Sequence, residues 1–239
     1  MIQLPAAYFD SEHLRLLQII YDNGGVVAGS FATAAVFPNI GVVPSDIDVW
    51  PNSLENYDKI ITTLQSEKEI MSSYEISSGY AHGLSSTNLE FSFSNRNFFM
   101  RKINNKTIKV QVIKKFYLYG YDIVKDFDFS ICKAFINSDL RTVQVSENMP
   151  SDINNKRLRI ENVKDLPIGL IHNRLVKYID RGFLPTIEDF IQLLSKISHA
   201  DRLQILSFFT NPDRCAVFTE DFTKKLNVLK GMEILSGGA

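Results

Sequence analysis

The segment from residue 26 to residue 50 constrains the fold more than any other. Residues 26–28 form a short apolar run, which is typical of a buried strand. Gly29 and Ser30 follow as a turn. Residues 31–37 have a helical pattern that Pro38 ends, and residues 47–50 indicate a second strand. A strand, a glycine turn, a helix and a strand in this order predict an α+β fold.

Two carboxylates lie on the second of these strands. Side chains at positions i and i+2 of a strand point to the same side, so Asp46 and Asp48 project together. Two like charges repel unless a cation lies between them, and oxygen ligands suit Mg²⁺ or Mn²⁺. Gly29 allows a ligand to approach the backbone closely, and the Ser30 hydroxyl can bind a phosphate. The pattern predicts phosphoryl or nucleotidyl transfer.

A third carboxylate would complete a site for two metal ions. The candidates are Asp126 and Asp128. We predict a long strand over residues 128–136 that Asp128 opens, whereas Asp126 is expected to end the helix before it. Asp128 is therefore favoured, and Asp126 stays open as the alternative.

Composition excludes several classes of protein. The chain has 239 residues, of which 45% are hydrophobic, so it is neither disordered nor a disulfide-stapled miniprotein. The two cysteines, Cys132 and Cys215, lack metal-ligand spacing and fit a reducing compartment. Neither a signal peptide nor a membrane span is expected, because the longest uncharged window, residues 23–45, is interrupted by glycines and prolines. These features favour a cytoplasmic protein.

Charge is distributed unevenly along a chain whose net charge is −1. Residues 91–121 contain seven basic residues and no acidic one, whereas residues 1–90 are strongly acidic. The basic stretch modestly favours a polyanionic partner such as RNA. A solvated hairpin whose edge is protected by lysines is the alternative interpretation.

The pattern changes after residue 160. Residues 168–179, 186–197, 201–209 and 219–232 have helical periodicity, and proline- or glycine-containing turns separate them. We therefore predict two domains: a catalytic domain over residues 1–160 and a C-terminal helical domain over residues 161–239.

Several of these motifs together resemble a known superfamily. Val27, Ala28, Gly29 and Ser30, then residues 45–50, then a later strand carboxylate resemble the nucleotidyltransferases related to DNA polymerase β. Residues 110–113, Phe127 with Asp128, Cys132 and, more loosely, residues 174–183 are similar to divergent viral and phage members. The resemblance implies a mixed sheet flanked by helices and followed by a helical domain. Fifteen residues separate Ser30 from Asp46, slightly more than is usual in the superfamily.

The resemblance also implies roles for single residues. Asp46 and Asp48 would hold the metal ions, Mg²⁺ or Mn²⁺, with ATP or another NTP, and Asp128 would bind the catalytic metal and help activate the acceptor hydroxyl. Gly29 and Ser30 would contact the terminal phosphates. The reaction would be in-line attack of a hydroxyl on the α-phosphate with release of pyrophosphate.

The helical domain carries two further candidates. Lys177 and Arg181 are four residues apart, so they share one helix face with Arg174. In related polymerases and cyclases a helical domain contributes to triphosphate binding, and we predict that Lys177 and Arg181 contact the NTP phosphates. A solvated helix face is the alternative.

The sequence leaves the acceptor open. An RNA 3′ end, a protein hydroxyl and a small molecule all fit a nucleotidyltransferase. The main alternative is a module with the same fold that has lost turnover and binds a protein partner, as a regulator or an antitoxin does. Walker A, GxGxxG and GxSxG motifs are absent from the sequence, which disfavours the NTPases, dinucleotide-binding enzymes and hydrolases that use them.

Overall fold

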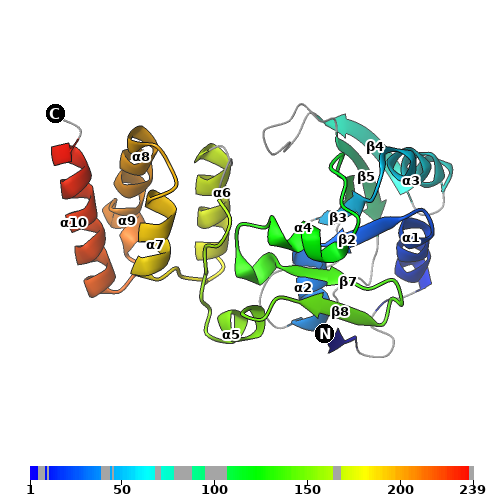
Figure 1. The fold of residues 1–239 in the computed structure, drawn as a ribbon, viewed down its shortest axis with the longest axis horizontal. Helices are drawn as coiled ribbons and strands as arrows, with labels where there is room; N and C mark the ends of the chain where they lie inside the picture. The colour runs from blue at the N-terminus through cyan, green and yellow to red at the C-terminus, as the bar shows by residue number, and fades with distance from the viewer. Residues whose placement is uncertain are drawn as a thin grey trace. The chain divides into compact units, whose positions relative to one another are not determined.

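The computed structural model describes residues 1–4, 9, 11–38, 44, 46–67, 71–77, 88–94, 107–163 and 168–236. The chain forms two compact units, Met1–Pro150 and Ser151–Ala239 (Figure 1). Each unit is described by itself below. That the chain has two domains with a boundary near residue 160 stays a prediction.

The first unit contains a mixed sheet, as the sequence predicts. Its described strands are arranged in the order β1-β8-β7-β2-β3-β6-β5-β4. Strands β3 and β6 are parallel, and the other neighbours are antiparallel. The strands are β1 (Ile2–Gln3), β2 (Gly25–Ala28), β3 (Asp46–Pro51), β4 (Met71–Ser77), β5 (Asn88–Ser94), β6 (Thr107–Val112), β7 (Ala134–Ile136) and β8 (Thr142–Val145).

Helices flank this sheet (Figure 1). They are α1 (Ser11–Asp22), α2 (Ser30–Val36), α3 (Leu54–Ser66) and α4 (Gly120–Lys125), followed by a 3₁₀ turn, η1 (Ser130–Cys132). Helix α5 (Met149–Asn154) begins in this unit and continues into the second. Helix α1 packs against α3 and β2, and α2 packs against β7 and β2. Leu16, Leu17 and Ile20 of α1 are fully buried, so this helix covers part of the core.

The predicted strand over residues 128–136 is wrong over most of its length. Only Ala134–Ile136 form a strand, β7, because the 3₁₀ turn η1 interrupts the chain before it. The amide of Cys132 donates to the carbonyl of Phe129, and the amide of Lys133 donates to that of Ser130. Asp128 therefore precedes a tight turn and does not open an alternating strand.

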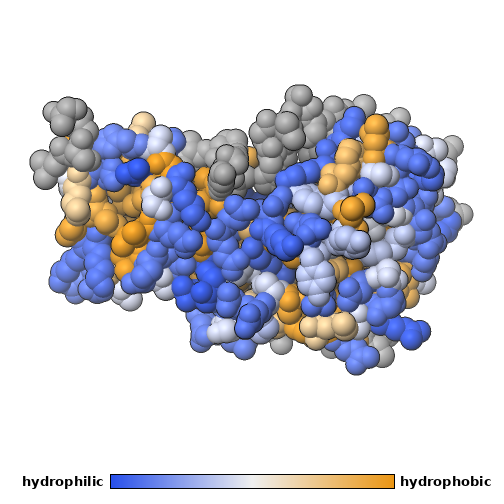
Figure 2. Space-filling model, viewed as in Figure 1, coloured by the Kyte–Doolittle hydropathy of each residue, from blue (hydrophilic) through white to orange (hydrophobic). Residues whose placement is uncertain are grey.

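The second unit is helical. After the end of α5 it contains α6 (Ile168–Ile179), α7 (Ile187–Leu194), α8 (His199–Phe209), α9 (Pro212–Cys215) and α10 (Glu220–Ser236). Its core includes Ile171, Leu175, Phe183, Phe190 and Phe209. Hydrophobic side chains also reach the surface over the C-terminal helices, among them Val228 and Met232 of α10 (Figure 2).

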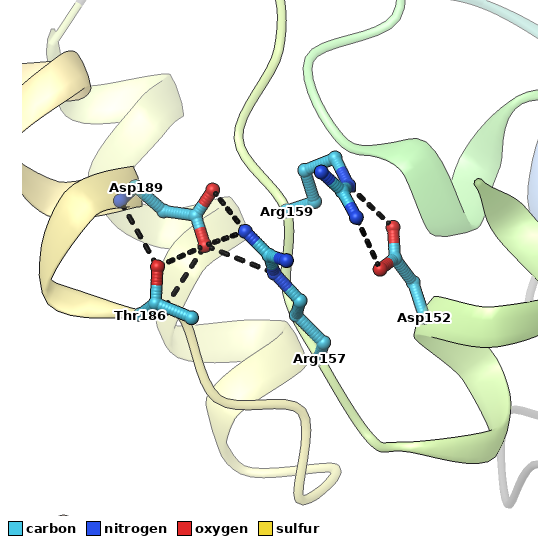
Figure 3. Close-up of polar contacts among 5 residues, drawn as sticks. All are labelled: Asp152, Arg157, Arg159, Thr186 and Asp189. Atoms are coloured by element: carbon cyan, nitrogen blue, oxygen red, sulfur yellow. Dashed lines mark hydrogen bonds and ion pairs between the residues drawn. The ribbon is translucent and has the colours of Figure 1, made fainter.

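Two arginine–aspartate pairs connect the segment between α5 and α6 to α7 and to α5 (Figure 3). Arg157 contacts Asp189 of α7 at 3.2 Å, and Arg159 contacts Asp152 of α5 at 2.8 Å. Both carboxylates are buried, whereas the arginine side chains keep about 30% of their surface exposed. Buried carboxylates require such partners, since an unpaired charge there is strongly destabilising.

Within the described parts of the chain, the helices are all too short or too polar to cross a membrane.

Candidate functional site

The turn at Gly29 connects β2 to α2. Gly29 has φ 92° and ψ −149°, a conformation that is essentially restricted to glycine. Its amide donates to the carbonyl of Ala134 at 2.9 Å, and its own carbonyl accepts from the amide of Thr33 at 3.0 Å. The glycine is therefore fixed from both sides, and Ser30, which is half-buried, begins the helix directly after it.

The carboxylate of Asp48 lies beside this turn. Strands β2 and β3 pair so that Ala28 is opposite Asp48. A Cβ placed on Gly29 would lie 3.3 Å from Oδ2 of Asp48 and 3.8 Å from the ring of Phe127. The missing side chain of Gly29 thus lets the Asp48 carboxylate and the Phe127 ring lie close to the turn.

Asp46 and Asp48 share one side of β3, as predicted from the alternation. Both are half-buried, whereas Ile47 and Val49 are fully buried. In the parallel pairing of β3 with β6, Asp46 lies opposite Lys109. The site thus places two carboxylates on one side of the strand, next to the glycine turn.

Asp126 and Asp128 have different surroundings. Asp126 is the C-cap residue of α4, as predicted, and its carboxylate accepts hydrogen bonds from Lys115, at 2.8 Å, and from the hydroxyl of Tyr117. Burial, together with the hydrogen bond to Asp126 and its charge, raises the pKa of the Tyr117 hydroxyl. Asp128 is only 3% exposed and lies between α4 and η1. Asp126 therefore already binds two partners that hold it at the helix end.

Thr33 is a positioning residue that sequence analysis missed. Its side chain is buried, and its Oγ1 lies 3.1 Å from the carbonyl of Gly29 and 3.0 Å from the carbonyl of Ile131. It thereby connects the glycine turn to the 3₁₀ turn that follows Asp128. No sequence signal marks Thr33, since Ile131 lies 98 residues further along. The sequence marks Phe127 only through its neighbour Asp128, within the motif that the two residues form.

The donor chemistry of the site fits a divalent cation in part. Asp46 and Asp48 supply the carboxylate oxygens that Mg²⁺ and Mn²⁺ prefer. Among the residues that the structure describes, however, no three His, Cys, Asp or Glu side chains form a group that could hold a metal ion. That Asp46 and Asp48 hold a metal ion, with Asp128 as a third ligand, stays a prediction.

Lys177 and Arg181 belong to the second unit. Lys177 is exposed on α6, and its Nζ lies 5.8 Å from the centre of the Tyr178 ring. The Arg181 guanidinium lies 5.5 Å from the same ring, just beyond the end of the helix. The two cations therefore lie near one buried ring. Their contact with a triphosphate stays a prediction.

Solved structures that resemble this chain include a CCA-adding enzyme and a tRNA-processing enzyme. A CCA-adding enzyme in complex with CTP has a TM-score of 0.52 at 12% identity, over 96% of this chain and 53% of that chain. A tRNA-processing enzyme in an apo form has a TM-score of 0.49 at 10% identity, over 94% of this chain and 57% of that chain. The chain thus spans about half the length of these structures, and the first likeness shows that it has a nucleotidyltransferase-like fold.

Sequence comparison identifies the family. A search of curated protein sequences found no significant match. A family model described as "Gabija anti-defense 2 family protein" matches residues 6–156, which is more than half of the chain. The chain therefore belongs to the Gabija anti-defense 2 (Gad2) family.

Proposed function

We propose that this protein is a metal-dependent nucleotidyltransferase that moves an NMP from an NTP to an acceptor hydroxyl. The observation that carries the proposal is the close approach of the Asp48 carboxylate to the glycine turn, 3.3 Å from the position that a Cβ of Gly29 would take, with Asp46 on the same side of β3. The nucleotidyltransferase-like fold supports it. A phosphate group needs such close access to the backbone, and a carboxylate pair next to it suits a bound cation.

Different residues of this chain would bind the metal ion, bind the phosphates and accept the proton. Asp46 and Asp48 hold Mg²⁺ or Mn²⁺, which when bound neutralises phosphate charge and makes the acceptor hydroxyl more acidic. Gly29 leaves room for the terminal phosphates, and the Ser30 hydroxyl donates a hydrogen bond to one of them. Asp128 takes up the proton of the acceptor hydroxyl, which suits its position in a buried segment.

The chemical step is a single displacement at the α-phosphorus. The acceptor oxygen forms a bond to this atom while the bond between the α-phosphorus and the bridging oxygen breaks. The bridging oxygen leaves with the β- and γ-phosphates as pyrophosphate, and the acceptor proton moves to Asp128. Holding the two reactants in line supplies much of the rate enhancement in such a reaction.

The family description suggests the biological role that this activity would serve. It names anti-defence action against Gabija, and we propose that nucleotidyl transfer is the means of that action. The acceptor is an RNA 3′ end, a protein or a small molecule. A catalytically silent module that only binds a partner fits the same description, so the decisive experiment must separate transfer from binding.

Transfer is tested by incubating the protein with each α-³²P-labelled NTP, Mg²⁺ or Mn²⁺, and RNA oligonucleotides, total cell protein or no acceptor. We expect label on one acceptor class. Asp48→Asn should lower transfer by at least about 100-fold, because it removes a charged ligand worth several kcal/mol to the transition state. Asp58→Asn, at an exposed aspartate of α3, is the matched control and should leave transfer unchanged.

The outcomes separate the two functions. Label transferred by the wild type and the Asp58→Asn variant alone supports catalysis and identifies the acceptor. If no acceptor is labelled while an NTP with Mg²⁺ still raises the melting temperature, the silent module is correct. If the NTP neither reacts nor binds, the assignment of the site itself is wrong.

A further inference from the structure

Residues 114–121 form an exposed apolar surface in the first unit. Leu118 is 75% exposed, Tyr119 68%, Tyr121 53% and Phe116 39%. Large apolar side chains so close together rarely face water unless they bind something. We name this segment the aromatic segment; it lies between the end of β6 and the first turn of α4.

The aromatic segment is held in place at both ends. At its start Lys115 and Tyr117 point inward and bind Asp126. At its end Gly120 lies so close to Phe135 that a Cβ on it would come within 2.5 Å of the ring, and Tyr121 packs edge-on against the same ring at 5.3 Å. The exposed side chains between these anchors are therefore presented by a fixed backbone, which lowers the entropic cost of binding a partner.

Exposure alternates along the first half of the segment. Lys114, Phe116 and Leu118 are exposed, whereas Lys115 and Tyr117 between them are half-buried. A cation and two large apolar side chains thus reach the solvent, although the backbone turns at Lys114, where the amide of Lys115 donates to the carbonyl of Ile113 at 2.9 Å. The Phe116 ring also packs edge-on against Tyr57 at 6.5 Å, which orients it.

Aromatic rings connect this surface to the candidate site. Tyr117 contacts Trp50 at 5.8 Å between ring centres, and Trp50 contacts Phe127 at 5.8 Å. Phe127 in turn lies next to the Gly29 turn, beside Asp48. The inward side of the aromatic segment is therefore joined to the candidate site through packed aromatic rings.

Charge indicates the kind of ligand. Residues 91–121 carry seven basic residues and no acidic one, in a chain with net charge −1. Lys109, Lys114 and Lys115 belong to the described part, while Arg96, Arg101, Lys102 and Lys106 lie outside it. Lys115 is paired with Asp126, so its charge is largely compensated. A basic stretch that ends in exposed aromatic rings suits a polyanion that has flat, apolar bases.

We propose that the aromatic segment binds single-stranded nucleic acid by stacking bases on Phe116 and Tyr119, with Lys114 close to the backbone phosphates. Base–aromatic stacking tolerates any sequence, so the surface selects for unpaired bases and not for a particular motif. That the bound strand is also the acceptor of the nucleotide rests on the proposed function. Binding itself does not, because it needs neither metal nor NTP.

The test measures fluorescence anisotropy of a labelled single-stranded RNA oligonucleotide with the full chain, without metal or NTP. DNA of the same sequence and the RNA duplex are run alongside. We expect the single strands to bind more tightly than the duplex. Phe116→Ala and Tyr119→Ala should each weaken RNA binding by roughly 10-fold, the order of one lost stacking contact. Tyr119→Phe keeps an aromatic ring and should bind RNA as the wild type does. Lys114→Ala should reduce the steepness of the salt dependence by about 0.7, the value for one phosphate of a single strand.

Matched controls keep the result interpretable. Leu54→Ala removes another exposed apolar side chain of the first unit, on α3, and should bind as the wild type does. Asp48→Asn should also bind normally while transferring no nucleotide, so the loss of catalysis and the loss of binding are distinguishable. The proposal is overturned if neither single strand binds, if the duplex binds as tightly, or if the ring deletions change affinity no more than Leu54→Ala does. A protein that binds the segment in place of nucleic acid would produce the first of these results.

Discussion

At the scale of single residues, Gly29 does two things that can be separated. Its backbone conformation, with φ 92° and ψ −149°, admits no other residue without strain, and its missing side chain lets the Asp48 carboxylate lie close to the turn. We predict that Gly29→Ala costs roughly 1–3 kcal/mol of stability from the strain. The new methyl group should also abolish the rise in melting temperature that a Mg²⁺–NTP complex produces, because it occupies the place of the phosphates.

Gly24→Ala is the control for destabilisation away from Asp48. Gly24 also has a positive φ, 72°, and an added Cβ would clash with Nδ2 of Asn56, so this variant is destabilised without a change at Asp48. Both variants should melt at lower temperature than the wild type, by about 2–4 °C for each kcal/mol lost. Only Gly29→Ala should also lose the response to nucleotide. If both variants keep that response, the turn at Gly29 does not hold the phosphates.

At the scale of elements, the start of α7 depends on one buried carboxylate. Asp189 accepts hydrogen bonds from the amide and the hydroxyl of Thr186, at 3.0 and 2.8 Å, and it pairs with Arg157 (Figure 3). It is thus at once part of a capping box and half of a partly buried ion pair. We predict that Asp189→Ala costs about 3 kcal/mol, since it removes the cap and leaves Arg157 without its partner.

Asp221→Ala is the matched control for this variant. Asp221 also lies in the first turn of a helix, α10, and pairs with Lys225 at 2.7 Å, but its side chain is 75% exposed. Exposed pairs contribute at most about 1 kcal/mol, so this variant should melt close to the wild type. Circular dichroism during heating compares the two. Equal melting temperatures would show that the Asp189 contacts do not hold α7 to the rest of its unit.

The sequence predicted those elements whose causes are local. The side on which Asp46 and Asp48 lie follows from alternation along one strand, and the turn at Gly29 follows from the residues on either side of it. The predicted strand at Asp128 failed because distant contacts determine this segment: the Thr33 hydroxyl, far away in sequence, lies 3.0 Å from the carbonyl of Ile131 in the 3₁₀ turn. The place of Phe127 beside Gly29 depends on tertiary packing in the same way.

At the scale of the whole molecule, the question is whether both units serve one ligand. The candidate site at Gly29, Asp46 and Asp48 belongs to the first unit, and Lys177 and Arg181 belong to the second. Each unit has its own buried core, so either could bind a ligand alone. The affinity for NTP therefore tests whether residues of the second unit contribute to nucleotide binding.

We predict that Lys177→Ala weakens binding of a Mg²⁺–NTP complex by about 5- to 10-fold, the order expected for one charged hydrogen bond to phosphate. Lys224→Ala is the control, because Lys224 is an exposed lysine of the same unit that pairs with Glu220 at 2.8 Å. Titration calorimetry with the full chain measures both affinities. If the two lysine variants bind the nucleotide as the wild type does, while Asp48→Asn does not, the nucleotide is held by the first unit alone. The helical unit then does not contribute to nucleotide binding.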